Sequence, residues 1–186
     1  MTRIAYQGVP GAFSEMAARA RYPDARMLPM ADFTAVVRAV TRGAVELGIL
    51  PIENVIIGTV EGAQAALDDA SGVKVVDEIQ FAIHHCLVAL PGAKLGAIRR
   101  VESHPAALAQ CARWLSAHRL PPHAVSDTAG AALSIATDRD FTRAAIAGAE
   151  AAARYGLAIL ARDIADLPDN RTRFVVIQRC RSEVAA

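Results

Sequence analysis

The order of apolar blocks along the chain of 186 residues constrains its fold more than any other feature. Short β-like blocks alternate with helical patterns, which is typical of an α/β architecture with largely parallel strands. Residues 73–90 form a β-like region longer than an ordinary strand, so we expect it to cross between two lobes. The pattern then restarts, and the chain returns toward the first lobe through residues 163–170. We therefore predict two α/β lobes joined by a hinge, with a cleft between them.

The lobes and their elements can be assigned to residue ranges. We expect residues 1–78 and 165–186 to form the first lobe and residues 79–164 the second. Strands are expected at residues 3–6, 25–30, 45–50, 99–102, 123–126, 144–147, 158–160 and 174–178. Helices are expected at residues 13–21, 33–43, 58–68, 105–118, 128–137 and 150–155, and a loop at residues 51–54. Asp32 is placed to cap the second of these helices.

Charge and cysteine content limit the kinds of partner and the compartment. The 20 basic and 19 acidic side chains give a formal net charge of +1, so no general attraction to nucleic acid or to an anionic membrane results. Cys86, Cys111 and Cys180 are odd in number and lack metal-ligand spacing, which favours reduced thiols. The N-terminus has no signal-peptide pattern, and no apolar stretch approaches the ~20 residues of a bilayer span. We predict a cytoplasmic protein without nucleic-acid or membrane partners.

The histidine pair at positions 84 and 85 does not indicate a metal site. His84 and His85 are adjacent on an expected strand, so their side chains should point to opposite faces and cannot chelate one ion together. We expect one of them to pack in the interior and the other to be solvated.

Five segments lie where strands pass into helices or where a strand begins. Ligands of α/β sheets collect at such junctions, and the unpaired N–H groups of helix N-termini favour anions there. Each segment alone has a structural explanation, since glycines can make a tight turn and Ser103 and Asp127 can be N-caps. Their occurrence together on one rim predicts a binding or catalytic site. The segments are residues 6–15, 51–54, 102–105, 126–129 and 170–174.

The last of these segments, Asn170-Arg171-Thr172-Arg173-Phe174, places a hydroxyl between two guanidinium groups. Two neighbouring cations would lower the pKa of the threonine hydroxyl and so help it to release a proton. Guanidinium groups also bind carboxylates through two parallel hydrogen bonds, so the same arginines could hold a dianionic substrate. The alternative is a solvated basic turn that leads into the strand at residues 174–178.

Taken together, the segments resemble prephenate dehydratases, which are enzymes of L-phenylalanine biosynthesis. The matches run in order over nearly the whole chain. They are residues 8–15 (G-V-P-G-A-F-S-E), 51–54 (P-I-E-N), 102–105 (E-S-H-P), 127–129 (D-T-A), 145–147 (A-I-A), 155–157 (Y-G-L) and 170–174 (N-R-T-R-F).

This resemblance implies a fold, a reaction and a set of site residues. The implied fold is that of the type II periplasmic binding proteins, with catalysis in the cleft between two α/β lobes. Thr172 matches the catalytic threonine of the family. The resemblance implies neither a metal nor an organic cofactor, and it leads us to expect a homodimer that binds a small-molecule substrate. The residues expected to bind substrate are Asn54, Ser103, Gln110, Thr128, Asn170, Arg173 and Phe174.

The implied reaction is the conversion of prephenate to phenylpyruvate. Loss of carbon dioxide pushes electrons through the ring and expels the ring hydroxyl, so the enzyme must position the substrate and supply a proton to the leaving oxygen. General-acid catalysis of this kind raises the reaction rate by a factor of ~10²–10⁴. We expect Thr172 to donate that proton or hydrogen bond, and Arg173 and helix N-termini to hold the carboxylates.

Two features of the chain depart from the family pattern. Val55 stands where the family has a serine after the Glu-Asn pair, which means either a lost cap worth ~1 kcal/mol or a reshaped pocket and a different substrate. The intact segment around Thr172 favours the lost cap. The chain ends about a dozen residues after Phe174, whereas many members continue into a regulatory ACT domain. We therefore expect no ACT domain and no feedback by phenylalanine through this polypeptide.

Three other functions remain open from the sequence. Arogenate, which carries an amino group in place of the keto group, is the alternative substrate, and residues 127–132 look equally like those of arogenate dehydratases. A prephenate decarboxylase that keeps the hydroxyl is disfavoured by the intact segment around Thr172. A non-catalytic solute-binding protein of the same bilobal shape is disfavoured by that threonine and by the lack of a signal-peptide pattern.

Overall fold

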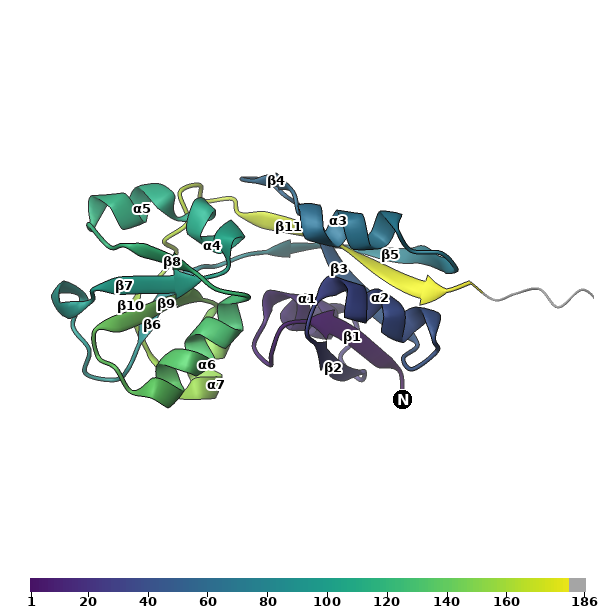
Figure 1. Ribbon diagram of the computed structural model, residues 1–186, viewed down its shortest axis with the longest axis horizontal. Helices are drawn as coiled ribbons and strands as arrows, with labels where there is room; N and C mark the ends of the chain where they lie inside the picture. Colours follow the sequence, from purple (N-terminus) through teal and green to yellow (C-terminus); the bar gives the residue numbers. More distant parts are fainter. Residues whose placement is uncertain (181–186) are drawn as a thin grey trace, which may run out of the picture.

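The computed structural model describes residues 1–180, which form two mixed α/β units, each built on its own sheet (Figure 1). Strand β5 (Val73–Ala82) belongs to the first sheet and strand β6 (Cys86–Ala89) to the second. The prediction that the long β-like region crosses between two units is therefore confirmed.

The first sheet combines parallel and antiparallel pairs. Its strand order is β2 (Arg26–Met30), β1 (Arg3–Gln7), β3 (Leu47–Asn54), β11 (Arg171–Arg179) and β5, with β4 (Gly58–Thr59) paired to β3. The pairs of β1 with β2 and β3 are parallel, whereas β11 runs antiparallel to both β3 and β5. The expectation of largely parallel strands is wrong here, because the returning chain inserts an antiparallel strand into the middle of the sheet.

Within the described residues the first unit has three helices, and one of them starts at a capping side chain. They are α1 (Phe13–Arg21), α2 (Phe33–Thr41) and α3 (Glu61–Asp68). The Asp32 carboxylate caps α2 as predicted, because it accepts a hydrogen bond of 2.6 Å from the N–H of Ala35. Val36 and Val40 are fully buried on one face of α2 and join a core beneath it.

Strand β3 extends through the segment that was expected to be a loop. Pro51, Glu53 and Asn54 pair with β11, and a register shift between Arg173 and Phe174 leaves Ile52 as an extra residue on β3. Such a bulge accommodates Pro51, which has no N–H to donate to the ladder. The expectation of a loop is therefore wrong, and Asn54 is held at the end of a strand.

The second sheet is also mixed. Its order is β10 (Ala158–Ala161), β6, β9 (Arg143–Ala147), β7 (Arg100–Ser103) and β8 (Pro122–Ala124). Its helical elements are η1 (Leu95–Ala97), α4 (Pro105–Gln110), α5 (Ala112–Ala117), α6 (Thr128–Asp138) and α7 (Ala149–Tyr155).

The single helix expected at residues 105–118 is divided at Cys111. The Asp166 carboxylate accepts hydrogen bonds from the N–H groups of Arg113, at 3.0 Å, and Trp114, at 3.2 Å. It thereby caps the first turn of α5, so a second helix begins where the first could have continued.

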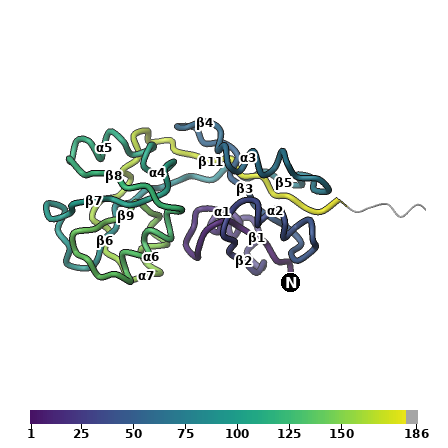
Figure 2. The backbone as a smooth tube through the Cα atoms, in the orientation of Figure 1, coloured from purple at the N-terminus to yellow at the C-terminus, as the bar shows by residue number. Residues whose placement is uncertain are grey.

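The chain passes between the units twice, at residues 83–85 and 162–170, and Figure 2 shows these two connections side by side. They are joined by a hydrogen bond of 2.8 Å from the N–H of Ile83 to the carbonyl of Asn170. The lobe boundaries at residues 78 and 165 stay a prediction. Because β5 pairs with β11 as far as Ala82, we propose that the first boundary lies at residues 83–85.

The two units also pack directly on each other. One buried cluster contains Tyr6 of β1 together with Ala132 of α6 and Ala151 of α7. The Tyr155 hydroxyl donates a hydrogen bond of 2.5 Å to the carbonyl of Pro10, in the loop between β1 and α1. Gly11, in the same loop, has φ of +96°, and a Cβ added there would lie 3.1 Å from the Cα of Ala151. This loop therefore fixes the units against each other at one side.

The helices of the described part of the chain all fall short of the length and apolar character that a membrane span requires.

Candidate active site

A pocket lies between the two units, and residues of both line it. The first unit contributes the start of α1, the end of β3 and the start of β11. The second unit contributes the N-terminal ends of α4 and α6, and the crossing segment contributes Ile83 and His85. The polar residues that line the pocket are Gln7, Ser14, Asn54, His85, His104, Gln110, Asp127, Thr128 and Thr172.

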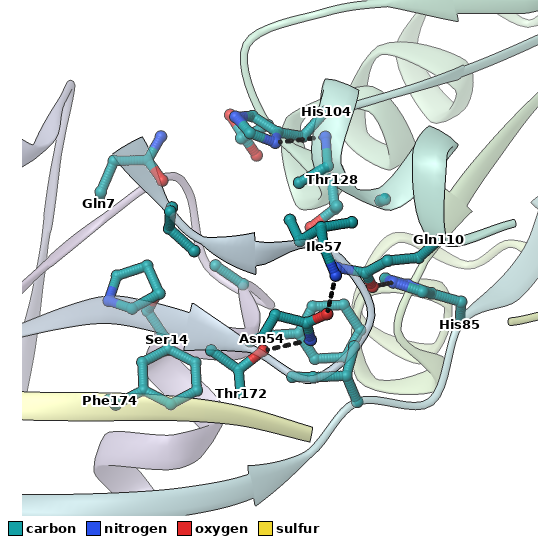
Figure 3. Close-up of a pocket in the computed structure, with 18 of the residues that line it drawn as sticks. Gln7, Ser14, Asn54, Ile57, His85, His104, Gln110, Thr128, Thr172 and Phe174 are labelled. Carbon is teal, nitrogen blue, oxygen red and sulfur yellow. Dashed lines mark hydrogen bonds between the residues drawn. The ribbon is translucent and has the colours of Figure 1, made fainter. Parts of the chain in front are cut away.

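Thr172 lies on the pocket face of β11. Side chains alternate along a strand, so Thr172 and Phe174 share this face and both are buried. The Oγ of Thr172 accepts a hydrogen bond of 3.0 Å from Nδ2 of Asn54, as Figure 3 shows. The hydroxyl hydrogen is then free to be donated to a group in the pocket.

The two arginines that flank Thr172 in the sequence lie on the other face of the sheet. Arg171 pairs with Asp169, with an Nε to Oδ1 distance of 2.5 Å. Arg173 pairs with Glu53 at 3.2 Å and with Glu78 at 3.6 Å. The expectation that two guanidinium groups surround the hydroxyl is therefore wrong, because residues 171–173 form a strand and not a turn.

Asn54 is held by backbone groups at both ends of its amide. Its Nδ2 donates to the carbonyl of Arg171 at 2.9 Å, and its Oδ1 accepts from the N–H of Ile56 at 3.0 Å. Nδ2 also lies 2.7 Å from Oδ1 of Asn170. Asn170 in turn donates from its Nδ2 to Oε1 of Gln110 at 2.9 Å. A chain of amides thus connects Thr172 in the first unit with Gln110 in the second.

The imidazole of His85 lies at the end of this chain of amides, next to Gln110. The sequence analysis did not identify His85 as a site residue. Its Nε2 lies 2.6 Å from Oε1 of Gln110, and the side chain is only 2% exposed. Burial lowers the pKa of His85 to about 4, a shift opposed by its hydrogen bond to Gln110 and assisted by the nearby His84. His84 is solvated and lies 2.9 Å from Asp163, so the expectation of one packed and one solvated histidine is confirmed. His84 and His85 lie in the connection between β5 and β6, so the expectation that they are on a strand is wrong.

The N-terminus of α1 presents backbone donors to the pocket. Its N-cap residue, Ala12, has no side chain that could bind them. In the described part of the chain, the N–H groups of Phe13 and Ser14 have no hydrogen-bond acceptor. The preceding glycine loop is fixed by the buried Glu15, which accepts a hydrogen bond of 2.7 Å from the N–H of Gly11. The two unpaired amides can therefore receive an anion.

The second unit contributes Asp127, Thr128 and His104. Asp127 caps α6 through a hydrogen bond of 2.5 Å from the N–H of Gly130 to its Oδ1. The Nδ1 of His104 accepts from the N–H of Ala106 at 3.1 Å, which leaves Nε2 to carry the proton. Burial lowers the pKa of His104, against the opposing charge of Asp127, which favours the neutral ring.

The structure brings most of the expected site residues together. Asn54, Gln110, Thr128, Thr172 and Phe174 line the pocket. Asn170 lies behind them and holds two of their amides. Ser103 is fully buried in the second sheet, where its hydroxyl donates to the carbonyl of Ile146 at 2.7 Å. Arg173 lies outside the pocket, where it pairs with Glu53. Within residues 1–180, no group of three or more His, Cys, Asp or Glu side chains could hold a metal ion.

Comparisons with known proteins relate this chain to one family and one fold. The sequence model of the family described as prephenate dehydratase matches residues 4–182. A curated relative, arogenate dehydratase/prephenate dehydratase 2 of Arabidopsis thaliana chloroplasts, is 44% identical over 177 residues, which are 95% of this chain and 46% of the relative. The chain therefore spans about half the length of the curated relatives it matches.

Solved structures extend the similarity to the fold. The prephenate dehydratase of Arthrobacter aurescens in complex with L-Phe has 31% identity and a TM-score of 0.86, over 97% of this chain and 61% of that one. GqqA, described as a quorum-quenching acylase, has 36% identity and a TM-score of 0.83, over 99% of this chain and 66% of that one. A periplasmic substrate-binding protein of Coxiella burnetii has 17% identity and a TM-score of 0.51, over 96% of this chain and 84% of that one. This last likeness concerns the fold alone, and with it the predicted bilobal fold of the periplasmic binding proteins is confirmed.

Proposed function

Because this chain belongs to the prephenate dehydratase family, we propose that it converts prephenate to phenylpyruvate, with loss of carbon dioxide and water, in the biosynthesis of L-phenylalanine. The observation that carries the proposal is the position of Thr172. Its hydroxyl faces a pocket between two units, and its oxygen is already occupied by Asn54. A hydroxyl held in this way has its hydrogen available for a substrate oxygen.

In the proposed reaction, the bond between the ring and its carboxylate breaks, and its electron pair enters the ring. The bond between the ring and the hydroxyl breaks at the opposite end, and the oxygen must gain a proton to leave as water. Thr172 donates to this oxygen, and Asn54 stabilises the charge that develops on Oγ as the proton moves. A proton from solvent then restores the hydroxyl of Thr172.

Neutral donors hold the substrate carboxylates in this proposal. Arg173 is engaged by Glu53 and Glu78, so we assign the carboxylates to the unpaired N–H groups of Phe13 and Ser14 and to the amide of Gln110. Ser103 is assigned an indirect role, because it anchors β7 immediately before the helix that carries Gln110.

The test is to identify the product that purified protein forms from prephenate. Phenylpyruvate is expected, and Thr172→Ala should lower turnover at least about tenfold while the far-UV spectrum is unchanged, because general-acid help is worth ~10²–10⁴. Unchanged turnover in Thr172→Ala would remove this residue from the mechanism. A decarboxylated product that keeps the hydroxyl, or recovery of intact prephenate, would contradict the proposed reaction.

Arogenate is a second candidate substrate, and one observation favours it. Among the described residues that line the pocket, Asp127 is the only carboxylate and none is Lys or Arg. Arogenate carries an ammonium group where prephenate has a keto group, so its charge suits such a pocket better. The curated relatives that match this chain are named arogenate dehydratases as well as prephenate dehydratases. The same incubation with arogenate tests this candidate, because its product is phenylalanine.

A homodimer also belongs to the proposal, and light scattering would test it. We do not extend the acylase activity of GqqA to this chain, because the described pocket residues include no serine or cysteine hydrogen-bonded to a histidine that could activate it.

A further inference from the structure

His85 is a buried polar side chain that the proposed mechanism does not yet use. It lies on the first crossing between the units, where its ring packs edge-on against Phe13 with the ring centroids 5.3 Å apart. Its Nε2 lies 2.6 Å from Oε1 of Gln110. Its Nδ1 is buried and has no hydrogen-bond partner in the described part of the chain. Its one polar contact is therefore with Gln110.

The direction of the hydrogen bonds in the amide chain follows from the backbone. The carbonyl of Arg171 can only accept and the N–H of Ile56 can only donate, so the Nδ2 and Oδ1 positions of Asn54 are fixed. Nδ2 of Asn54 faces Asn170 at 2.7 Å, so the acceptor Oδ1 of Asn170 must lie there. The other end of the Asn170 amide, Nδ2, is then the donor toward Gln110.

The position of the proton on His85 follows from its contact with Gln110. Oε1 of Gln110 accepts from Asn170 at 2.9 Å, so it is an oxygen that must also accept from His85. Nε2 of His85 therefore carries a hydrogen. With both donors on Oε1, the NH₂ group of Gln110 points away from them, and Gln110 lines the pocket.

We propose that His85 is a positioning residue, which holds the amide of Gln110 so that its NH₂ group is directed at an oxygen of the substrate. This inference rests on the proposed function, because it assigns Gln110 to substrate binding. Figure 3 shows the arrangement, with His85 beside Gln110 and away from Thr172. Without His85, one hydrogen bond from Asn170 would orient the amide alone, and the donor could turn away from the substrate.

Burial keeps His85 suited to this role. It lowers the pKa to about 4, with the hydrogen bond to Gln110 acting in the opposite direction and His84 assisting. His85 is then neutral at pH 7, and its single hydrogen is on the nitrogen that faces Gln110. Phe13 packs on the ring, Gln110 is its hydrogen-bond partner, and the adjacent His84 is solvated; no carboxylate forms a hydrogen bond with the ring in the described chain.

A double-mutant cycle tests the coupling of His85 to Gln110. His85→Leu should lower kcat/KM at least about tenfold, whereas the same change in a Gln110→Met background should lower it less than about twofold. A general loss of structure would instead give the same factor in both backgrounds, and that result would overturn the proposal. So would full activity of His85→Leu. His84→Leu is the matched control, since His84 is solvated and does not line the pocket, and it should retain wild-type kcat/KM.

A second variant and a spectroscopic measurement make the test independent of folding and of activity. His85→Gln keeps an N–H donor and should recover most of the kcat/KM lost in His85→Leu, and equal loss in both variants would count against the proposal. Long-range ¹H–¹⁵N spectra of the wild-type protein should show His85 with its proton on Nε2 between about pH 6 and pH 8. A proton on Nδ1 would overturn the inference. This spectrum decides about His85 even if neither prephenate nor arogenate is turned over, which is the result that would refute the proposed function instead.

Discussion

Mild acid should destabilise the fold through His85. Its pKa is about 4 in the folded chain and 6.5 in the unfolded chain, so the unfolded state binds the proton more tightly. Each pH unit of difference is worth about 1.4 kcal/mol, and the full effect is about 3 kcal/mol. The sign follows from the lowered value: the stability is complete above about pH 6.5 and is lost as the pH falls toward 4. About 2 kcal/mol should be lost by pH 4.5.

The measurement is urea unfolding of the wild type and of His85→Leu at several pH values from about 7 to 4.5. The variant lacks this titrating group, so its free energy of unfolding should fall by about 2 kcal/mol less than that of the wild type over this range. His104 and Glu102, whose pKa values are also lowered, titrate in both proteins and cancel in the comparison. His84→Leu should keep most of this pH dependence, because burial and not His84 is the main cause of the lowered pKa of His85. Parallel curves for the wild type and His85→Leu would refute the assignment of a buried neutral imidazole.

Three further changes test the site and its support. Thr172→Ser should keep more turnover than Thr172→Ala, because the hydroxyl survives, and equal rates would argue against a hydroxyl function. Asp127→Asn keeps an oxygen to cap α6 but removes the charge, so the ratio of kcat/KM for arogenate to that for prephenate should fall about tenfold, equivalent to about 1.4 kcal/mol. Asp32→Asn is the control, because Asp32 caps a helix outside the pocket, and it should leave this ratio unchanged. An unchanged ratio in Asp127→Asn would show that Asp127 does not affect the choice between the two substrates. Gly11→Ala should lower the free energy of unfolding by about 1–3 kcal/mol, because of its positive φ and its close approach to the neighbouring helix, whereas Gly96→Ala meets open space and should not.

The features that could be predicted from the sequence depend on local rules. Helix α1 spans the predicted residues, and Asp32 and Asp127 cap helices as expected, since a cap depends on the next three residues. The pocket position of Asn54 and Thr172 also followed, because junction segments were expected to meet on one rim. These predictions did not require knowledge of which strands pair.

The features that could not be predicted depend on pairing between distant segments. Residues 171–173 resemble a basic turn until they are placed between β3 and β5, where strand alternation separates Thr172 from Arg173. The role of His85 was missed for the same reason. Its partner Gln110 is 25 residues away in the sequence, and only the crossing of the chain brings the two side chains together.

The separation of Thr172 from Arg173 suits the proposed chemistry. The reaction is driven by electrons that leave the departing carboxylate, so a cation beside that carboxylate would stabilise the ground state and oppose its loss. Backbone N–H groups and the amide of Gln110 can orient a carboxylate with a weaker hold on its charge. A pocket lined by apolar side chains such as Phe174 also removes water from the carboxylate, which favours release of neutral carbon dioxide. The absence of Lys and Arg among the described lining residues is therefore compatible with the proposed reaction, and Arg173 lies on the opposite face, where Glu53 and Glu78 neutralise it.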